Sequence, residues 1–286
     1  MSNNLVNRLR RLTLAVLAVL AALGASLPAL AADGKVYTLA VIPSAPPVTL
    51  NMKWTPLVDR LAKETGLEFR LKHYEKMAEF ERDIWSGTPD FIFSSPIQLM
   101  VGHTSEGYIP LVRGGKSVAI GLYVRKDSPI KTIDDLAGKK ISFVGNKNLC
   151  SVFMQHLLAH QSTALSFEQE YAGSTKNVLI NVILGKSDAG SVFLPEMARQ
   201  SEETRSQLRE IVVTPEIAPH PLSAHPRVPH GVQEAVKRAM LAIAASADGA
   251  QILKTVNLEA LVAADYARDY KALEAVDVKG LTNWGQ

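Results

Sequence analysis

Apolar and polar positions along the chain follow two alternating patterns, which predict strands and helices in succession. Short apolar runs, such as residues 36–42 and 90–93, are typical of buried strands. Between them lie segments with apolar residues three or four positions apart, such as Leu57, Val58 and Leu61. Strands that alternate with helices in this way favour an α/β fold, in which each sheet is mostly parallel and is flanked by helices.

The predicted elements form two sets. In the first set, Thr55 and Pro56 indicate the start of a helix that Gly66 ends. The other elements of this set are a strand at 67–71, a helix at about 77–87, a strand at 90–93 and a helix after position 96. The second set has strands at 140–144, 188–193 and 209–213, and helices at about 150–160, at 176–184 and from 195.

Two extended segments connect these sets. Residues 118–125 form a long apolar run that no helix follows at once, and residues 214–228 are rich in proline. We therefore expect two lobes joined by two crossing segments, with a ligand between the lobes. Lobe 1 is expected to comprise residues 32–118 and 226–286, and lobe 2, with the crossing strands, residues 119–225. The chain after about position 231 is predicted to be mostly helical.

The start of the chain has the features of a secretory signal peptide. Three arginines precede an apolar run, and small residues spaced A-x-A follow it. We expect cleavage after Ala31 and export to the periplasm. A membrane anchor is the alternative, but the run is shorter than the roughly 20 apolar residues that span a bilayer.

Removal of residues 1–31 leaves 255 residues with 28 basic and 28 acidic side chains. This balance gives no reason to expect a nucleic-acid partner. Cys150 is the single cysteine, so no disulfide forms within the chain.

Several segments together resemble a known family. They are A-V-I-P at 40–43, W-T-P-L-V at 54–58, L-A-K-E-T-G at 61–66, G-T-P-D-F-I-F at 87–93, V-R-K-D-S-P-I at 124–130, D-L-A-G-K at 135–139, G-S-T at 173–175 and G-K-S-D-A at 185–189. In order and spacing they resemble the phosphonate- and phosphite-binding proteins of bacterial ABC importers. The resemblance implies the two-lobe type II periplasmic binding protein fold, solute binding without catalysis, and a membrane permease as partner.

The positions that hold the ligand in this family differ here. The family usually has Ser-Thr-Ser-Gly where this chain has N-L-C-S at 148–151. A histidine usual after Gly-Ser is replaced by Thr175, and a tyrosine at the crossing strand corresponds to Val118. The identity of the solute therefore cannot be taken from the family.

Helix starts are the expected source of ligand contacts, because their unpaired N–H groups and partial positive charge hold anions. Hydroxyls and amides near these starts, and at the carboxyl ends of strands, add polar contacts. The candidate ligand-binding residues are Ser44, Ser94, Ser95, Asn146, Asn148, Cys150, Ser151, Ser174, Thr175, Lys176 and Ser191. The same serines, threonines and asparagines are also ordinary helix caps, and Lys147 and Lys176 are also typical of a solvated surface.

These features favour a binding protein for a small anionic or polar solute, such as a phosphonate, phosphite or phosphate, that serves an ABC permease in the inner membrane. A subunit that presents its ligand state to a sensor kinase is the alternative. A third hypothesis is a metal or redox accessory protein using Cys150, Met154 and the pair His156 and His160, although their spacing gives no ordinary metal site. We expect no cofactor, no metal ion and a monomer.

Overall fold

Two mixed sheets flanked by helices make up the computed structural model, which describes residues 34–161 and 165–278. The expected signal peptide, residues 1–31, lies outside the described residues. Within the described ranges, no helix combines the length and the apolar character needed to cross a membrane.

The first sheet belongs to lobe 1, and its strand order is β11-β4-β10-β3-β1-β2. The strands are β1 (Val36–Val41), β2 (Glu68–Lys72), β3 (Phe91–Phe93), β4 (Ile109–Arg113), β10 (Pro221–Ala224) and β11 (Val262–Ala263). Strand β1 pairs in parallel with β2 and β3, whereas β10 is antiparallel to both β3 and β4. The sheet is therefore mixed rather than mostly parallel.

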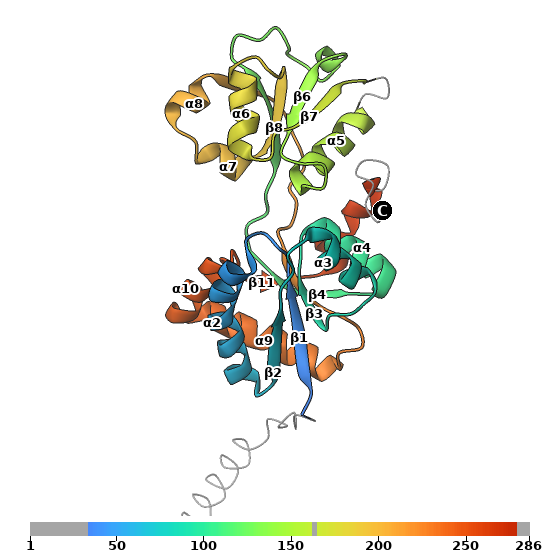
Figure 1. The fold of residues 1–286 in the computed structure, drawn as a ribbon, viewed down its shortest axis with the longest axis vertical. Helices are drawn as coiled ribbons and strands as arrows, with labels where there is room; N and C mark the ends of the chain where they lie inside the picture. The colour runs from blue at the N-terminus through green and yellow to red at the C-terminus, as the bar shows by residue number, and fades with distance from the viewer. Residues whose placement is uncertain (1–33, 162–164, 279–286) are drawn as a thin grey trace, which may run out of the picture. The chain divides into compact units, whose positions relative to one another are not determined.

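Helices flank the first sheet on both faces (Figure 1). They are α2 (Pro47–Thr65), α9 (His230–Ala245) and α10 (Ala247–Thr255) on one face, and α3 (Met77–Trp85) and α4 (Pro96–Glu106) on the other. The short elements α11 (Tyr266–Asp269) and η2 (Lys271–Ala275) follow at the end of the described chain. The apolar stripes of these helices supply a core in which Phe80, Ile84 and Ile92 are fully buried.

The second sheet belongs to lobe 2, and its strand order is β7-β6-β8-β5-β9. The elements of this lobe are β5 (Ile120–Arg125), η1 (Asp134–Leu136), β6 (Lys140–Phe143), α5 (Leu149–Gln161), β7 (Glu168–Tyr171), α6 (Thr175–Ile183), β8 (Ala189–Phe193), α7 (Leu194–Ala198), α8 (Glu202–Ser206) and β9 (Leu208–Val213). Strand β6 is parallel to β7 and β8, and β5 is antiparallel to β8 and β9.

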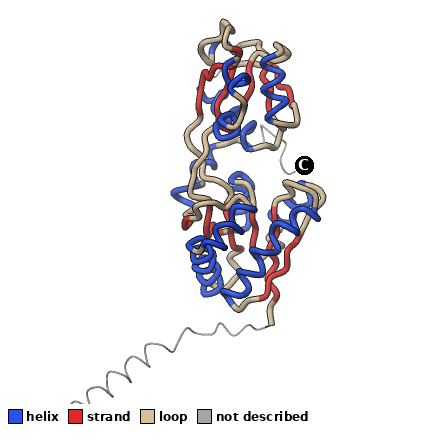
Figure 2. The backbone as a smooth tube through the Cα atoms, turned by 90° about the vertical axis from the view of Figure 1, so that its left-hand side faces the viewer, coloured by secondary structure: helices blue, strands red, loops and turns tan. Residues whose placement is uncertain are grey.

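Neighbouring residues of β8 show that α5 and α6 cover opposite faces of the second sheet. A Cβ added at Gly190 would lie 2.7 Å from Val178 of α6, whereas Ser191 contacts Cys150 of α5. Successive side chains of a strand point to opposite faces. Figure 2 shows the helices and strands of the chain in a view turned by 90° from that of Figure 1.

The start of α2 differs from the prediction. The helix begins at Pro47 rather than at Pro56, and its end at Thr65, before Gly66, agrees with the prediction. Pro46-Pro47 already provides a favourable first turn, so Pro56 lies inside the helix. The hydroxyl of Thr55 donates to the carbonyl of Asn51 (2.8 Å) and does not cap the helix. Gly66 ends it with a left-handed φ of 70°.

The crossing segments are shorter in the structure than the two extended segments that the sequence predicts. Val118 makes only an isolated antiparallel bridge to Ile217, and β5 begins at Ile120 in the second sheet. Residues 221–224, which the sequence places in the return crossing, form β10 between β3 and β4. The chain thus leaves the first sheet after β4 and has returned to it by Pro221.

Candidate functional site

The carboxyl ends of β1 and β3 bring Ser44 and Ser94 to the same edge of the first sheet. The two strands are parallel neighbours, and the N–H of Ile42 donates to the carbonyl of Phe93 (3.0 Å). Ser44 is exposed. Ser94 is fully buried, and its hydroxyl has no hydrogen-bond partner within the described residues. An unpaired buried hydroxyl is costly, so Ser94 is the candidate whose polar group most needs a partner.

Ser95 caps α4. Its hydroxyl accepts from the N–H of Gln98 (3.2 Å), and its own N–H donates to the Gln98 side-chain oxygen (3.0 Å). This capping box satisfies two backbone donors, which agrees with the helix-cap interpretation of Ser95. The Gln98 amide also donates to Glu81 of α3 (3.2 Å).

In lobe 2, α5 and α6 start at one edge of the sheet. Strands β6 and β7 are parallel, and the N–H of Gly173 donates to the carbonyl of Val144 (2.9 Å) immediately after them. Residues 145–148 lead into α5, and Ser174 precedes α6. The partial positive charges of both helix starts therefore lie at the carboxyl edge, where the sequence predicts ligand contacts.

Several polar side chains at the start of α5 are bonded within the lobe. The Asn148 side-chain oxygen accepts from the N–H of Cys150 (2.9 Å), and the Ser151 hydroxyl accepts from the N–H of Gly145 (3.4 Å). Cys150 and Ser191 contact each other across 3.4 Å, and both are buried. Asn146 is exposed. The side chains at this start therefore shape the loop. The backbone N–H groups of Leu149 and Ser151 are the better source of contacts to a solute.

The start of α6 is capped in the same way. Ser174 accepts from the N–H of Asn177 (3.2 Å), and the Thr175 hydroxyl donates to the carboxylate of Glu196 on α7. Lys176 is exposed. Glu196 was not a candidate from the sequence, because a single acidic residue in the first turn of a short helix carries no distinctive signal.

Burial makes Cys150 a poor nucleophile. The side chain is 1 % exposed, and desolvation raises the pKa of its thiol to about 12. The hydrogen bond with the Ser191 hydroxyl lowers the pKa of the thiol, and the negative charge of Glu196 raises it. A reactive or metal-binding cysteine needs an accessible thiolate, which this environment disfavours. Among the described residues, no three His, Cys, Asp or Glu side chains are placed to hold a metal ion.

A charged pair links the lobes close to these helix starts. Lys147, in the loop before α5, lies 3.4 Å from the carboxylate of Glu81 on α3. Glu81 also accepts the hydrogen bond from Gln98 in the first turn of α4. The contacts from Ser95 through Gln98 and Glu81 to Lys147 therefore connect the starts of α4 and α5.

His220, in the return crossing, is a further polar group near β3. Its ring centroid lies 5.8 Å from that of Phe93, the residue before Ser94. Burial lowers the pKa of His220 to about 4, so the imidazole is neutral at pH 7. A neutral imidazole can donate or accept a hydrogen bond but adds no positive charge.

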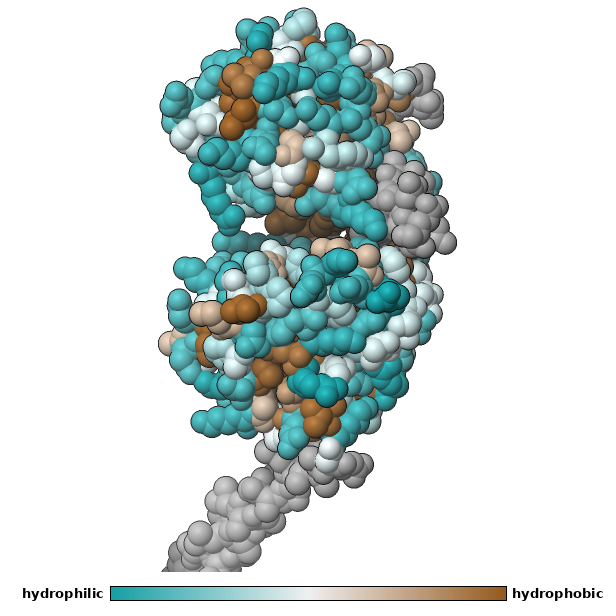
Figure 3. All heavy atoms as spheres, in the orientation of Figure 1, coloured by the Kyte–Doolittle hydropathy of each residue, from teal (hydrophilic) through white to brown (hydrophobic). Residues whose placement is uncertain are grey.

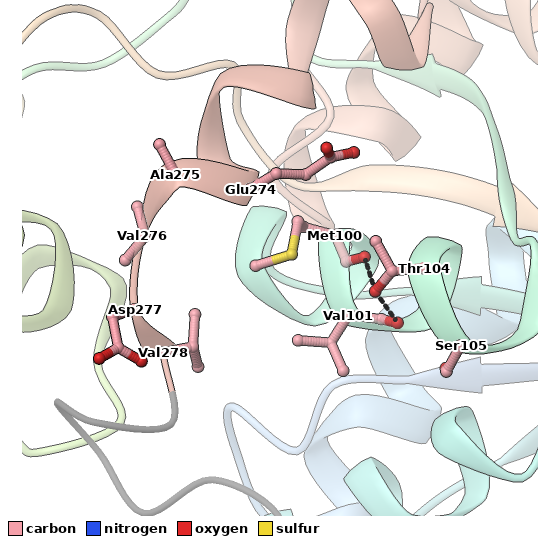
Figure 4. Close-up of a pocket in the computed structure, with 9 residues that line it drawn as sticks. All are labelled: Met100, Val101, Thr104, Ser105, Glu274, Ala275, Val276, Asp277 and Val278. Atoms are coloured by element: carbon pink, nitrogen blue, oxygen red, sulfur yellow. Dashed lines mark hydrogen bonds between the residues drawn. The ribbon is translucent and has the colours of Figure 1, made fainter.

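The larger pocket is unsuited to an anion. It has a volume of about 670 Å³ and lies between α4 and residues 274–278 (Figure 4). The Thr104 hydroxyl in its wall donates to the carbonyls of Met100 and Val101 in its own helix, at 3.1 and 2.9 Å. The charged groups of the wall are the carboxylates of Glu274 and Asp277, which repel an anion.

A second pocket of about 360 Å³ lies between α5, residues 215–217 and the end of the described chain. Its wall includes the histidines 156 and 160, and the acidic residues Glu216 and Asp269. Neither pocket includes any of the eleven candidate residues. The face shown in Figure 3 is mostly hydrophilic, with apolar atoms in small separate groups.

Solved structures with similar folds include XAC2383 from Xanthomonas citri bound to chloride ion, with a TM-score of 0.71 and 16% identity over 87% of this chain and 99% of that chain. PhnD1 from Prochlorococcus marinus in complex with methylphosphonate has a TM-score of 0.66 and 17% identity over 88% and 99%. A binding protein component of an ABC phosphonate transporter from Pseudomonas aeruginosa has a TM-score of 0.54 and 13% identity over 80% and 82%. At these identities the likeness shows a shared two-lobe fold.

No curated protein matches the sequence. A family model described as the periplasmic substrate-binding protein of phosphonate ABC transporters matches residues 39–270, which is well over half of the chain. The chain therefore belongs to the phosphonate-binding family of periplasmic substrate-binding proteins of ABC transporters.

Proposed function

We propose that this protein captures a small anionic or polar solute, such as a phosphonate, phosphite or phosphate, between its two lobes and delivers it to an ABC permease in the inner membrane. The family consists of substrate-binding proteins and not of enzymes. Export by a signal peptide to the periplasm and a monomeric state are part of the proposal. The lobe boundaries predicted from the sequence also remain a proposal, except that residues 221–224 belong with lobe 1 because they form β10 of its sheet.

One observation supports the proposed site most strongly. The starts of α5 and α6 share the carboxyl edge of the second sheet, and the loop before α5 contacts lobe 1 beside the start of α4. Backbone N–H groups at helix starts bind oxyanions without requiring a particular side chain. This explains how the fold could retain anion binding although the family's usual side chains are replaced at positions 148–151 and 175.

The side-chain contacts divide the candidates into two groups. Ser95, Asn148, Ser151, Ser174 and Thr175 have hydrogen bonds that stabilise the helix starts or connect them to neighbouring helices. Ser44, Ser94, Asn146 and Lys176 are the better candidates for direct contact, because three of them are exposed and the hydroxyl of Ser94 is unpaired. Cys150 and Ser191 are proposed to position the start of α5 against β8 through their buried contact, without touching the solute.

A thermal-shift screen tests the function. Phosphate, phosphite, methylphosphonate, sulfate and a small organic acid are each added to the mature protein, and the melting temperature is measured. A solute that binds only the folded state stabilises it by about 2.7 kcal/mol at 100 times its Kd. We expect at least one oxyanion to raise the melting temperature with saturation. If none does while the protein melts cooperatively, the proposed solute class is wrong.

Lys176→Met tests the contribution of the exposed lysine at the start of α6, and Lys186→Met is the matched control on the same lobe. Both lysines are exposed. We expect Lys176→Met to weaken binding of the best oxyanion severalfold and Lys186→Met to leave it unchanged. Equal affinities for the two variants would remove Lys176 from the site.

A further inference from the structure

Glu81 is a buried carboxylate in lobe 1. The residue is 1 % exposed, and its carboxylate accepts a hydrogen bond from the neutral Gln98 amide (3.2 Å). A buried carboxylate is destabilising unless a positive charge and hydrogen bonds compensate it. Lys147 provides that charge at 3.4 Å.

The compensating charge comes from the other lobe. Lys147 lies in the loop between β6 and α5, and its side chain is 31 % exposed. The turn is fixed by hydrogen bonds from Asn148 N–H to the carbonyl of Gly145 (3.1 Å) and from Gly145 N–H to the Ser151 hydroxyl (3.4 Å). The position of Lys147 is therefore tied to the start of α5, and movement of lobe 2 moves the lysine with it.

We propose that Glu81 and Gln98 form a binding site in lobe 1 for the Lys147 side chain of lobe 2, and that this contact holds the lobes together. Closure of the lobes is then coupled to the protonation of Glu81. Lys147 and Glu81 are positioning residues in this proposal, because they act through the relative placement of the lobes. The effect on solute affinity rests on the proposed function, whereas the effect on the distance between the lobes does not.

The direction of the proton linkage follows from the contacts of Glu81. Burial raises the pKa of Glu81, while the Gln98 hydrogen bond and the Lys147 charge oppose this rise. Separation of the lobes removes the Lys147 charge, which raises the pKa of Glu81, and admits water to the carboxylate, which lowers it. We take the loss of the charge as the larger effect, because Gln98 of the same lobe stays packed against Glu81. Protonation therefore favours separated lobes, and the contact is lost as the pH falls through the pKa of Glu81. One linked proton changes the ratio of joined to separated lobes by at most about tenfold per pH unit.

Asp83 of α3 belongs to a different cluster. Asp83 is hydrogen-bonded to Lys72 of β2 and to Tyr74 (2.9 Å to the tyrosine), and these contacts lower the pKa of Asp83 against the effect of its burial. Among the described residues, Gln98 of α4 and Lys147 of lobe 2 are the polar partners of the Glu81 carboxylate. The pH dependence should therefore disappear when either member of the Glu81–Lys147 pair is neutralised.

Distances between spin labels on the two lobes test the proposal without any solute. Lys63→Cys on α2 and Glu203→Cys on α8 provide exposed label sites, and the buried Cys150 should not be labelled. Double electron–electron resonance is measured between pH 8 and pH 5 in the otherwise unchanged chain and in the Glu81→Gln, Lys147→Met and Lys147→Arg backgrounds. Lys186→Met is the control for loss of a surface lysine. Circular dichroism confirms that each protein is folded.

We expect the unchanged chain, the Lys147→Arg background and the Lys186→Met control to shift toward longer distances as the pH falls. Glu81→Gln and Lys147→Met should give the longer distances at every pH. Because Lys147 is partly exposed, Lys147→Met keeps the test decisive even if Glu81→Gln does not fold. The proposal is overturned if all backgrounds give the same pH-independent distances, or if the acid shift persists in Glu81→Gln or Lys147→Met. A failed solute screen alone would leave these results unaffected.

Discussion

Cys150 should be almost inert toward thiol reagents in the folded protein. Burial raises the pKa of its thiol from an ordinary 9.0 to about 12. At pH 8 this lowers the thiolate fraction from about one in ten to about one in ten thousand, a loss of about a thousandfold. The residue is also 1 % exposed, so the reagent cannot reach the sulfur without local opening.

The assay is the absorbance change with an aromatic disulfide reagent at pH 8, in native buffer and in guanidinium chloride. Lys63→Cys, at an exposed position on α2, is the internal reference for an accessible thiol. We expect the reference cysteine to react at least a thousandfold faster than Cys150 in native buffer, and both to react rapidly after unfolding. Reaction of native Cys150 within tenfold of the reference rate would refute the argument and favour the redox or metal hypothesis.

Three further changes have predictable effects. Gly190→Ala places a Cβ 2.7 Å from a valine of α6 and should lower the free energy of unfolding, measured in urea, by about 1–3 kcal/mol. In the control Gly145→Ala the new Cβ meets no atom within 4 Å, so the free energy of unfolding should change by less than about 0.5 kcal/mol. Equal effects of the two substitutions would contradict the packing argument. Ser95→Ala removes the cap of α4 and should cost about 1 kcal/mol in the same assay, and an unchanged midpoint would show that the capping box contributes little. Burial raises the pKa of Asp269, but hydrogen bonds from two arginines outweigh this effect and bring the pKa down to about 2. Ionised Asp269 therefore stabilises the folded protein above the ordinary pKa of an aspartate, and this stabilisation is lost between about pH 4 and pH 2. Asp269→Asn should therefore lose about 2 kcal/mol at pH 7 and show a flatter decline in acid, and a parallel decline would refute this role.

Local signals in the sequence predicted much of the fold. The apolar runs gave the central strands, and Gly66 ends α2 where its conformational freedom predicts. The Ser95-Pro96 start of α4 is also where the pattern places it. The predicted start of α2 is wrong because the segment contains two prolines that could each begin a helix, and the helix begins at Pro47, before Pro56.

Long-range pairing could not be predicted from the same signals. Residues 221–224 form β10 because β3 and β4 leave a position between them, and a proline-rich segment gives no local indication of this. The mixed character of both sheets has the same origin. Strand direction depends on how the chain returns to the sheet, and hydrophobic periodicity does not encode it.

The sequence places the candidate residues at helix starts, and the structure has Ser95, Ser151 and Ser174 there; their contact with a solute stays a prediction. A serine in the sequence cannot be assigned to a cap or to a ligand before its partner is known, and Ser95 and Ser174 have backbone partners. Glu81 and Glu196 carry no distinctive pattern, since their importance comes from Lys147 and Thr175, which are distant in sequence.

Amide chemical shifts in a titration with the best oxyanion from the thermal-shift screen test the central claim most directly. If helix starts hold the solute, the largest changes in the proton–nitrogen NMR spectrum should fall on the backbone amides at 97, 149, 151, 175 and 176, and they should saturate with a single Kd. The amides at 98, 99, 150, 152 and 177 already donate to Ser95, Asn148 or Ser174 and should change less. Largest changes in the pockets beside residues 274–278 or 215–217, or none at saturating solute, would contradict the account.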